Sequence, residues 1–286
     1  MVKFKTIQSP YWKPGTNYCK IIADLIKPVI RDGDVIVISE KAVATAKNRL
    51  VNEDGVIPGF SARLLVTFWI RIIWGWFLSY VCRFKAPTMR RLRHYPIQNG
   101  SHHKQTILIY RGPIHALHYG SEGGIDLNNV PYALACLPLD EPINDAKAIF
   151  NHVHAISKKQ LTVIISDTDS TFSWKNLHFT SRSHAVKGII PLNNPLAFII
   201  GRFARLQQRA TPLTFVGQKI SVNDALRFAE IAHRARGQGA GRTVWDSAKK
   251  FGVELPDITW EQLASIKHFP IVVIRRTKRA RIVKCP

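Results

Sequence analysis

The chain has 286 residues, of which 46% are apolar, so it can bury a large core and is too apolar for a disordered protein. Its 41 Lys and Arg residues outnumber 19 Asp and Glu residues, and the resulting net charge of +22 favours anionic partners. Four cysteines without CxxC spacing argue against a zinc module or a disulfide framework and predict a reducing, cytoplasmic location.

The chain begins with a predicted helix and strand. Apolar residues recur at helical spacing between Ile21 and Ile30, and the turn RDGD then leads into a buried strand at 35–39. The loop predicted at 39–49 contains Lys41 and Lys47, and cations after a strand end can meet phosphates. An ordinary solvated loop is the alternative interpretation.

The segment 62–84 is long, aromatic and almost uncharged, with Arg71 inside it. A helix buried in the core or in a subunit interface is the first interpretation. A helix lying in the plane of a membrane surface is the second, with Trp69, Trp74 and Trp76 at the headgroups. A transmembrane span is the third, and it would place Arg71 near the middle of the bilayer, where charge is costly.

Strands are predicted at 106–110 and 132–137, with a loop rich in Gly and Asn between them at 118–131. This loop carries Glu122, Asp126, Asn128 and Asn129. A helix that Asn144 would cap leads to a strand at 161–167, and the loop 163–171 then presents further oxygen ligands, Asp167, Thr168 and Asp169. Carboxylate, hydroxyl and amide oxygens suit Mg²⁺ or Mn²⁺, whereas helix capping and tight turns are the alternative use of the same residues.

The last third is predicted to contain a helix after Pro195, a strand at 212–216, a helix at 222–236 and a strand at 270–276. The loop 236–243, RGQGAGRT, offers backbone N–H groups and Arg side chains to phosphate, although helix capping alone explains Gly237. The eleven histidines lack metal-site spacing and are treated as ordinary surface or core residues. Interleaved helices and strands predict an α+β fold with a mixed sheet packed with helices, in a single domain at 1–274 with a basic tail at 275–286.

Taken together, these segments resemble the coenzyme F420-0:L-glutamate ligase family of GTP-dependent gamma-glutamyl ligases. The resemblance lies in IADLIKPVIRDGDVIVISEKAVATAKNR, GGIDLNNVP, VIISDT and RGQGAG, spread over most of residues 15–241. It implies an α+β ligase that dimerises and joins L-glutamate to F420-0, an anionic small-molecule acceptor, through an acyl phosphate. GTP would be the co-substrate, with two divalent ions, Mg²⁺ or Mn²⁺, and a monovalent cation as an additional candidate.

Carried over by position, the resemblance also implies a set of site residues. The metal ligands would be Asp126, Asp167, Thr168 and Gln238. The nucleotide contacts would be Glu40, Lys41, Asn129, Gly237, Gln238, Gly239, Gly241 and Arg242. Catalytic residues are not assigned.

The chain departs from the family pattern in three places. The family Lys of the first loop falls on Thr45, so Lys41 or Lys47 must replace it if a cation is needed. The sequence after SDT differs from the family, and neither 62–84 nor RRLRHYPIQNGSHHKQ is typical of it. The rival interpretations are an amide ligase with another acid acceptor, a peripheral membrane protein that contacts lipid through 62–84, and a nucleic-acid-binding protein. Nucleic acid is not expected, because the aromatic residues form no RNA-binding signature.

Overall fold

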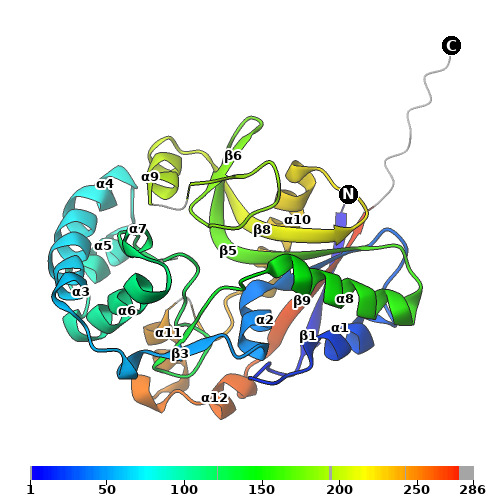
Figure 1. Ribbon diagram of the computed structural model, residues 1–286, viewed down its shortest axis with the longest axis horizontal. Coiled ribbons are helices and arrows are strands. Elements are labelled where there is room, and N and C mark those ends of the chain that lie inside the picture. The colour runs from blue at the N-terminus through cyan, green and yellow to red at the C-terminus, as the bar shows by residue number, and fades with distance from the viewer. Residues whose placement is uncertain (1, 121, 193–194, 242, 277–286) are drawn as a thin grey trace.

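The computed structural model describes residues 2–120, 122–192, 195–241 and 243–276. Its centre is a mixed sheet of seven strands (Figure 1). Strands β2 and β5 run parallel, and β9 lies antiparallel to β2 on its other side. The order is β1 (Val2–Ser9), β9 (His268–Arg276), β2 (Val35–Ser39), β5 (Thr162–Trp174), β6 (Leu177–Thr180) and β7 (Ile190–Pro191), with β8 (Gln207–Gly217) also paired to β5.

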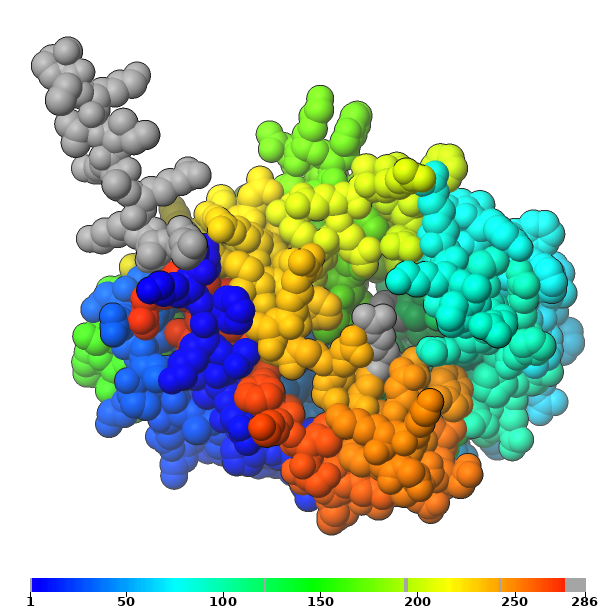
Figure 2. Space-filling model, turned by 180° about the vertical axis from the view of Figure 1, so that it is seen from behind, coloured from blue at the N-terminus to red at the C-terminus, as the bar shows by residue number. Residues whose placement is uncertain are grey.

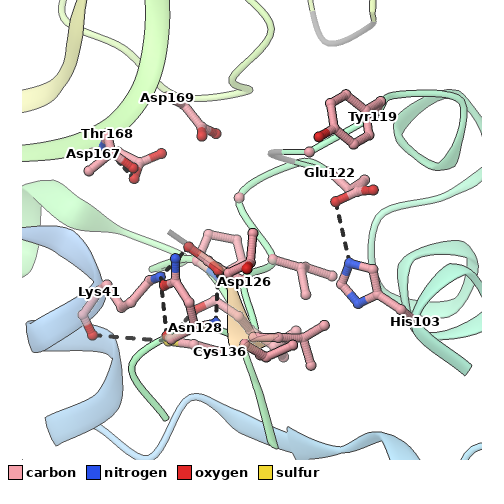
Figure 3. A pocket seen from close by; sticks show the side chains of 18 of the residues that line it. Lys41, His103, Tyr119, Glu122, Asp126, Asn128, Cys136, Asp167, Thr168 and Asp169 are labelled. Atoms are coloured by element: carbon pink, nitrogen blue, oxygen red, sulfur yellow. Dashed lines mark hydrogen bonds and ion pairs between the residues drawn. The ribbon is translucent and has the colours of Figure 1, made fainter. Parts of the chain in front are cut away.

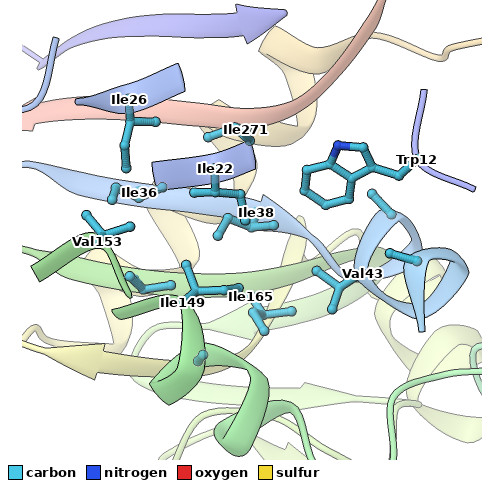
Figure 4. Close-up of a cluster of buried hydrophobic side chains, with 14 of the residues drawn as sticks. Trp12, Ile22, Ile26, Ile36, Ile38, Val43, Ile149, Val153, Ile165 and Ile271 are labelled. Atoms are coloured by element: carbon cyan, nitrogen blue, oxygen red, sulfur yellow. The ribbon is translucent and has the colours of Figure 1, made fainter. Parts of the chain in front are cut away.

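Helices cover both faces of this sheet. Helices α1 (Tyr18–Ile26) and α8 (Pro142–Ser157) pack on one face together with α2 (Glu40–Ala46), and α10 (Val222–Arg236) packs on the other. Ile36 and Ile38 of β2 therefore enter one core (Figure 4) and Val35 and Val37 the other. A strand covered on both faces is apolar at every position, which is why VIVI has no polar alternation.

A second group of helices, here called the helical lobe (residues 60–116), lies beside the sheet at the left of Figure 1. Its own core contains Ile70, Trp74, Cys82 and Leu92. Phe60–Val81 is one continuous helical stretch, and by length and composition alone it is the single described helix that could cross a membrane. The lobe comprises α3 (Phe60–Leu64), the π-helix η2 (Leu65–Leu78), α4 (Ser79–Val81), α5 (Ala86–Arg93), α6 (Ile97–Tyr110) and α7 (Pro113–Ala116).

Short elements connect these two parts. They are the two-stranded ladder of β3 (Leu50–Asn52) and β4 (Leu134–Cys136), η1 (Glu53–Gly55), α9 (Leu196–Phe203), α11 (Val244–Phe251), η3 (Leu255–Asp257) and α12 (Trp260–Ser265). Ser221 caps α10 and Thr259 forms a capping box with Gln262. The cap predicted at Asn144 is wrong, because α8 begins at Pro142 with Glu141 as its N-cap and Asn144 lies inside the helix. The α+β prediction is confirmed.

The strand predicted at 106–110 is wrong. These residues are the last turn of α6, in which Thr106 and Ile107 are buried while Ile109 and Tyr110 are exposed. A run of β-branched residues resembles a buried strand, but here only one side of a helix is covered. At the C-terminus, β9 includes Arg275 and Arg276, the first two residues of the predicted tail, and 277–286 lie outside the described residues.

Candidate functional site

Two of the predicted loops begin at the same edge of the sheet. Strands β2 and β5 are parallel neighbours, and Ser39 pairs with Ser166 in their ladder. Glu40 and Lys41 therefore leave β2 beside Asp167, at the carboxyl ends where open sheets bind ligands. The predicted loop 39–49 contains helix α2, so Lys41 stands on its first turn.

The segment Asp167–Ser170 does not end β5 but forms a bulge within it. Against β8, Asp167 pairs with Thr211 and Ser170 with Ala210, so Thr168 and Asp169 bulge out of the ladder. Bulges aim side chains away from a regular strand and are common beside functional sites. The bulge therefore turns the hydroxyl of Thr168 and the carboxylate of Asp169 out of the regular ladder, next to Asp167, at the end of the first buried part of β5.

Asp126 is held opposite this bulge by backbone hydrogen bonds. Its N–H donates to the Cys136 carbonyl at 3.1 Å, and the Cys136 N–H donates to the Asp126 carbonyl at 2.8 Å. The Asn128 N–H donates to Asp126 Oδ1 at 3.0 Å. The Lys41 ammonium donates to the side chains of both Asp126 and Asn128 (Figure 3). Lys47 instead pairs with Asp145 at 2.7 Å, so of these two lysines only Lys41 belongs to the site.

Two cavities meet at these residues, one of about 400 Å³ and one of about 680 Å³. We call the first the acceptor cavity, after the role proposed for it below, and the second the loop cavity. Each is lined by the same five residues, here called the shared wall: Lys41, Asp126, Asn128, Asp167 and Thr168.

The loop cavity is rich in cations and contains the predicted Gly-rich loop. Gly239 has a φ of +60°, and Asn129 Oδ1 accepts a hydrogen bond from the Ala240 N–H at 2.8 Å, which fixes the loop against the Asp126 loop. Burial lowers the pKa of Arg236 to about 10, although Asp167 opposes that shift. Further lining residues are Arg234, Gly237, Gln238, Gly241, Lys267 and His268, whereas Arg242 lies outside the described residues.

The acceptor cavity is lined by aromatic side chains that come from distant segments. Phe84, Tyr95 and Arg91 belong to the helical lobe, and Tyr119 follows it. Phe198 of α9 and Trp245 of α11 add to the walls. Seen from behind, the surface is hollowed between the cyan helical lobe and the yellow and orange segments (Figure 2).

Arg182 is a site residue that sequence reasoning missed. Its buried guanidinium donates to both carboxylate oxygens of Glu40 at 2.7 Å and lies within 4 Å of the carboxylates of Asp167 and Asp169. Burial raises the pKa of Glu40 to about 7 even though Arg182 opposes the shift. Glu40 thus lines the acceptor cavity as part of an ion pair. No local pattern marks Arg182, which stands 142 positions from Glu40.

The role of His103 was also missed, as were its contacts with Glu53 and with Glu122, which the sequence had marked only as a loop carboxylate. The His103 ring contacts Glu53 at 2.7 Å and Glu122 at 3.3 Å, and Lys104 donates to Glu122 at 2.9 Å. Burial opposes protonation of His103, but the two carboxylates raise its pKa to about 10. His103 and Glu122 line the acceptor cavity, so this histidine is more than an ordinary core residue. The only available signal was the run HHK, directly before the apolar end of α6.

The described residues fit a divalent ion that is shared with phosphate. Within the described part of the chain, no three His, Cys, Asp or Glu side chains are grouped to hold a metal by themselves. Magnesium, however, commonly takes one or two protein carboxylates and completes its shell with phosphate and water. Asp167 Oδ2 is buried and accepts no hydrogen bond from the described residues, although Arg182 Nε lies 3.5 Å from it, and Asp126 lines the same two cavities as Asp167. Asp126, Asp167, Thr168 and Gln238 all line the loop cavity.

Comparison with known proteins agrees with this geometry. Residues 6–210 match the family model described as F420-0:Gamma-glutamyl ligase. The chain is also 31% identical, over 281 residues, to an uncharacterized protein of Methanocaldococcus jannaschii, and the match covers 94% of each chain. The quoted motifs come together in the fold: three of them contribute residues to the shared wall, and RGQGAG lines the loop cavity. The chain belongs to the F420-0:gamma-glutamyl ligase family, as a divergent member.

Proposed function

We propose that the protein is a GTP-dependent ligase that forms an amide bond between L-glutamate and an acid acceptor, with F420-0 as the first candidate acceptor. The observation that supports this most directly is the shared wall. The loop cavity would hold GTP and the acceptor cavity the acid, so the γ-phosphate and the acceptor carboxylate would meet at Lys41, Asp126 and Asp167.

The proposed reaction has two steps. An acceptor carboxylate oxygen attacks the γ-phosphorus of GTP, the bond to GDP breaks, and an acyl phosphate forms. The amine nitrogen of glutamate then attacks the carbonyl carbon, and phosphate and a proton leave. The Lys41 ammonium, which lines both cavities, would balance charge on the transferred phosphoryl group. The positive loop cavity suits a triphosphate.

The divalent ions, Mg²⁺ or Mn²⁺, would be held by Asp126, Asp167, Thr168 and Gln238 together with phosphate, and would neutralise phosphate charge when bound. The Asn129-anchored loop, Gly237–Gly241, would present backbone N–H groups to the nucleotide. A bound monovalent cation, a homodimer and a cytoplasmic location remain proposals.

An isotope experiment tests the mechanism. Acceptor labelled with ¹⁸O in its carboxylate is incubated with protein, GTP, Mn²⁺ and glutamate, and the released phosphate is analysed by mass spectrometry. One ¹⁸O atom should appear in the phosphate, because the acyl phosphate passes its bridging oxygen to phosphorus. Unlabelled phosphate alongside amide product would contradict the acyl phosphate.

Two variants test the assignment of the shared wall. Asp126→Asn and Asp167→Asn should each lower GDP release by about 100-fold or more, because each removes charge where phosphate and cation meet. Asp140→Asn is the control, since that exposed carboxylate pairs with Arg49 and lines neither cavity. Normal metal-dependent turnover in either variant would remove the assignment.

One observation favours a second candidate, a ligase of the same kind with a different acid acceptor. The walls of the acceptor cavity include Phe84, Arg91 and Tyr95, from the segments that are not typical of the family. A screen of organic acids for glutamate-dependent GDP release would identify that acceptor. F420-0 giving the highest kcat/KM would contradict this alternative.

A further inference from the structure

The long helical stretch Phe60–Val81 of the helical lobe carries a row of exposed apolar residues at every fourth position. They are between 42% and 82% exposed, although large apolar side chains in such a row normally pack against something. We call them the exposed stripe: Phe60, Leu64, Phe68, Ile72, Trp76 and Tyr80.

The π-helix keeps this stripe straight. An α-helix has 3.6 residues per turn, so side chains spaced by four drift around its axis. The i→i+5 hydrogen bonds of a π-helix put more residues in each turn. The Ser79 N–H donates to the Trp74 carbonyl in this manner. Residues spaced by four therefore remain nearly in line along Leu65–Leu78 and form one continuous apolar edge.

The opposite side of the same helix is fixed to the protein. Val66, Ile70 and Trp74 are buried, and the indole N–H groups of Trp69 and Trp74 donate to the Leu117 carbonyl at 2.7 and 2.9 Å. A membrane-spanning position would break these contacts. The helix is therefore held with one face inward and the exposed stripe outward, which is the arrangement of an in-plane surface helix.

The charged residues of the lobe's own sequence have one sign. From residue 55 to residue 121 the sequence contains no Asp or Glu. Over the same stretch it contains nine cationic residues: Arg63, Arg71, Arg83, Lys85, Arg90, Arg91, Arg93, Lys104 and Arg111. Arg63, Arg83, Lys85, Arg90 and Arg91 are exposed.

Helix α9 extends the apolar surface. Leu196, Ile200 and Phe203 are exposed on it, and Arg202 of α9 donates to the Cys82 carbonyl at 3.1 Å, which ties the two helices together. Exposed apolar side chains are therefore present both on the stripe helix and on α9, which meet at Cys82 and Arg83.

We propose that this surface docks in the plane of an anionic lipid bilayer, with the exposed stripe among the acyl chains and the basic residues at the headgroups. A second copy of this chain would bring two acid-free basic lobes together, and like charges disfavour that pairing. A nucleic acid would use the basic residues but leave the stripe exposed to water. The proposal does not depend on the ligase reaction.

Vesicle sedimentation tests it with the full chain. Vesicles of phosphatidylcholine with about one third phosphatidylglycerol are compared with vesicles of phosphatidylcholine alone, at low and physiological salt. The wild-type protein should bind the anionic vesicles about tenfold more tightly than the neutral ones, since the basic residues supply part of the attraction.

The decisive variant is Phe60→Ser with Phe68→Ser, which should reduce binding to anionic vesicles about tenfold because it removes the inserted side chains. Its control is Trp174→Ser with Leu177→Ser, two exposed apolar residues of the β5–β6 hairpin, which should bind like the wild type. Circular dichroism and thermal unfolding establish that both variants fold. A third variant, Arg83→Gln with Lys85→Gln, should weaken binding to anionic vesicles and leave neutral vesicles unchanged.

Three outcomes would overturn the proposal. One is a wild-type protein that binds neither kind of vesicle. Another is a folded Phe60→Ser, Phe68→Ser variant that binds like the wild type. In the last, the wild type forms a dimer or an RNA complex but does not bind vesicles, and the Phe60→Ser, Phe68→Ser variant loses that complex. This result would assign the stripe to that partner instead.

Discussion

At the scale of single residues, the structure distinguishes two lysines that the sequence left equivalent. Lys41 contacts Asp126 and Asn128, whereas Lys47 pairs with Asp145 on α8. Lys41→Met should lower kcat about 100-fold, because a preorganised cation at the phosphoryl group is lost. Lys47→Met should retain kcat within about threefold, since neither Lys47 nor its partner Asp145 lines either cavity. Steady-state GDP release measures both, and equal losses would contradict the assignment.

Two glycines of the same loop give a second residue-scale prediction. A Cβ at Gly124 would lie 1.3 Å from Arg182 Nη1, whereas a Cβ at Gly120 would meet nothing within 4 Å. Both glycines have positive φ. Gly124→Ala should displace the buried guanidinium from Glu40 and destabilise the protein by about 3–5 kcal/mol. Gly120→Ala carries only backbone strain, about 1–2 kcal/mol. Chemical denaturation of the two variants measures their free energies of unfolding. Equal destabilisation would show that Arg182 can move away from a Cβ at position 124 without destabilising the protein.

At the scale of elements, the turn after α10 joins the loop cavity to the Asp126 loop. A Cβ at Gly239 would lie 2.4 Å from Asn129 Oδ1, the atom that accepts from the Ala240 N–H. Gly239→Val should therefore move the turn and raise the nucleotide Kd by about tenfold, the factor that corresponds to one lost hydrogen bond. Calorimetry with GTP and Mn²⁺ measures it, and Gly252→Val is the control, since Gly252 also has a positive φ, meets nothing within 4 Å and lines neither cavity. An unchanged Kd in Gly239→Val would mean that this turn serves only to cap α10.

At the scale of the whole molecule, four buried side chains connect the helical lobe to the rest of the chain. His103 and Lys104 come from α6, Glu53 from η1 and Glu122 from the loop that leads to Asp126. The lysine also donates to the His118 carbonyl at 2.7 Å. This network carries two positive and two negative charges when His103 is protonated, so the attachment of the lobe depends on one proton.

That proton makes stability depend on pH. The folded pKa of His103 is raised to about 10 against an ordinary value of 6.5, because Glu53 and Glu122 face it. Above pH 6.5 the unfolded chain releases the proton while the folded chain keeps it, so the free energy of unfolding should fall as pH rises from 6.5 to 8.5. Urea denaturation at several pH values should show a smaller fall in His103→Gln than in the wild type. His102→Gln, whose ring contacts only the Glu53 carbonyl among these groups, should retain the wild-type slope. Identical slopes in all three proteins would mean that His103 is neutral in the fold.

Much of the fold could be predicted from the sequence because it is encoded locally. The run VIVIS predicts β2 within its observed bounds, and Ser221 and Thr259 mark the starts of α10 and α12 through side-chain hydrogen bonds to residues three positions away. The same holds for part of the candidate site. Lys41, Asp126 and Asp167 follow turn and strand signals, and the structure places all three in one wall.

The sequence by itself determined the α+β class, the family and these motif residues, since periodicity, caps and motif spacing act over a few positions. Only the tertiary structure decided which residues surround them. Arg182 reaches Glu40 across 142 positions, and His103 reaches Glu53 across 50, so their charges balance only after the chain has folded. The strand mistaken at 106–110 has the same cause, because burial on one side of a helix depends on what packs there. The division into two cavities and the outward direction of the exposed stripe likewise follow from how the helical lobe packs beside the sheet.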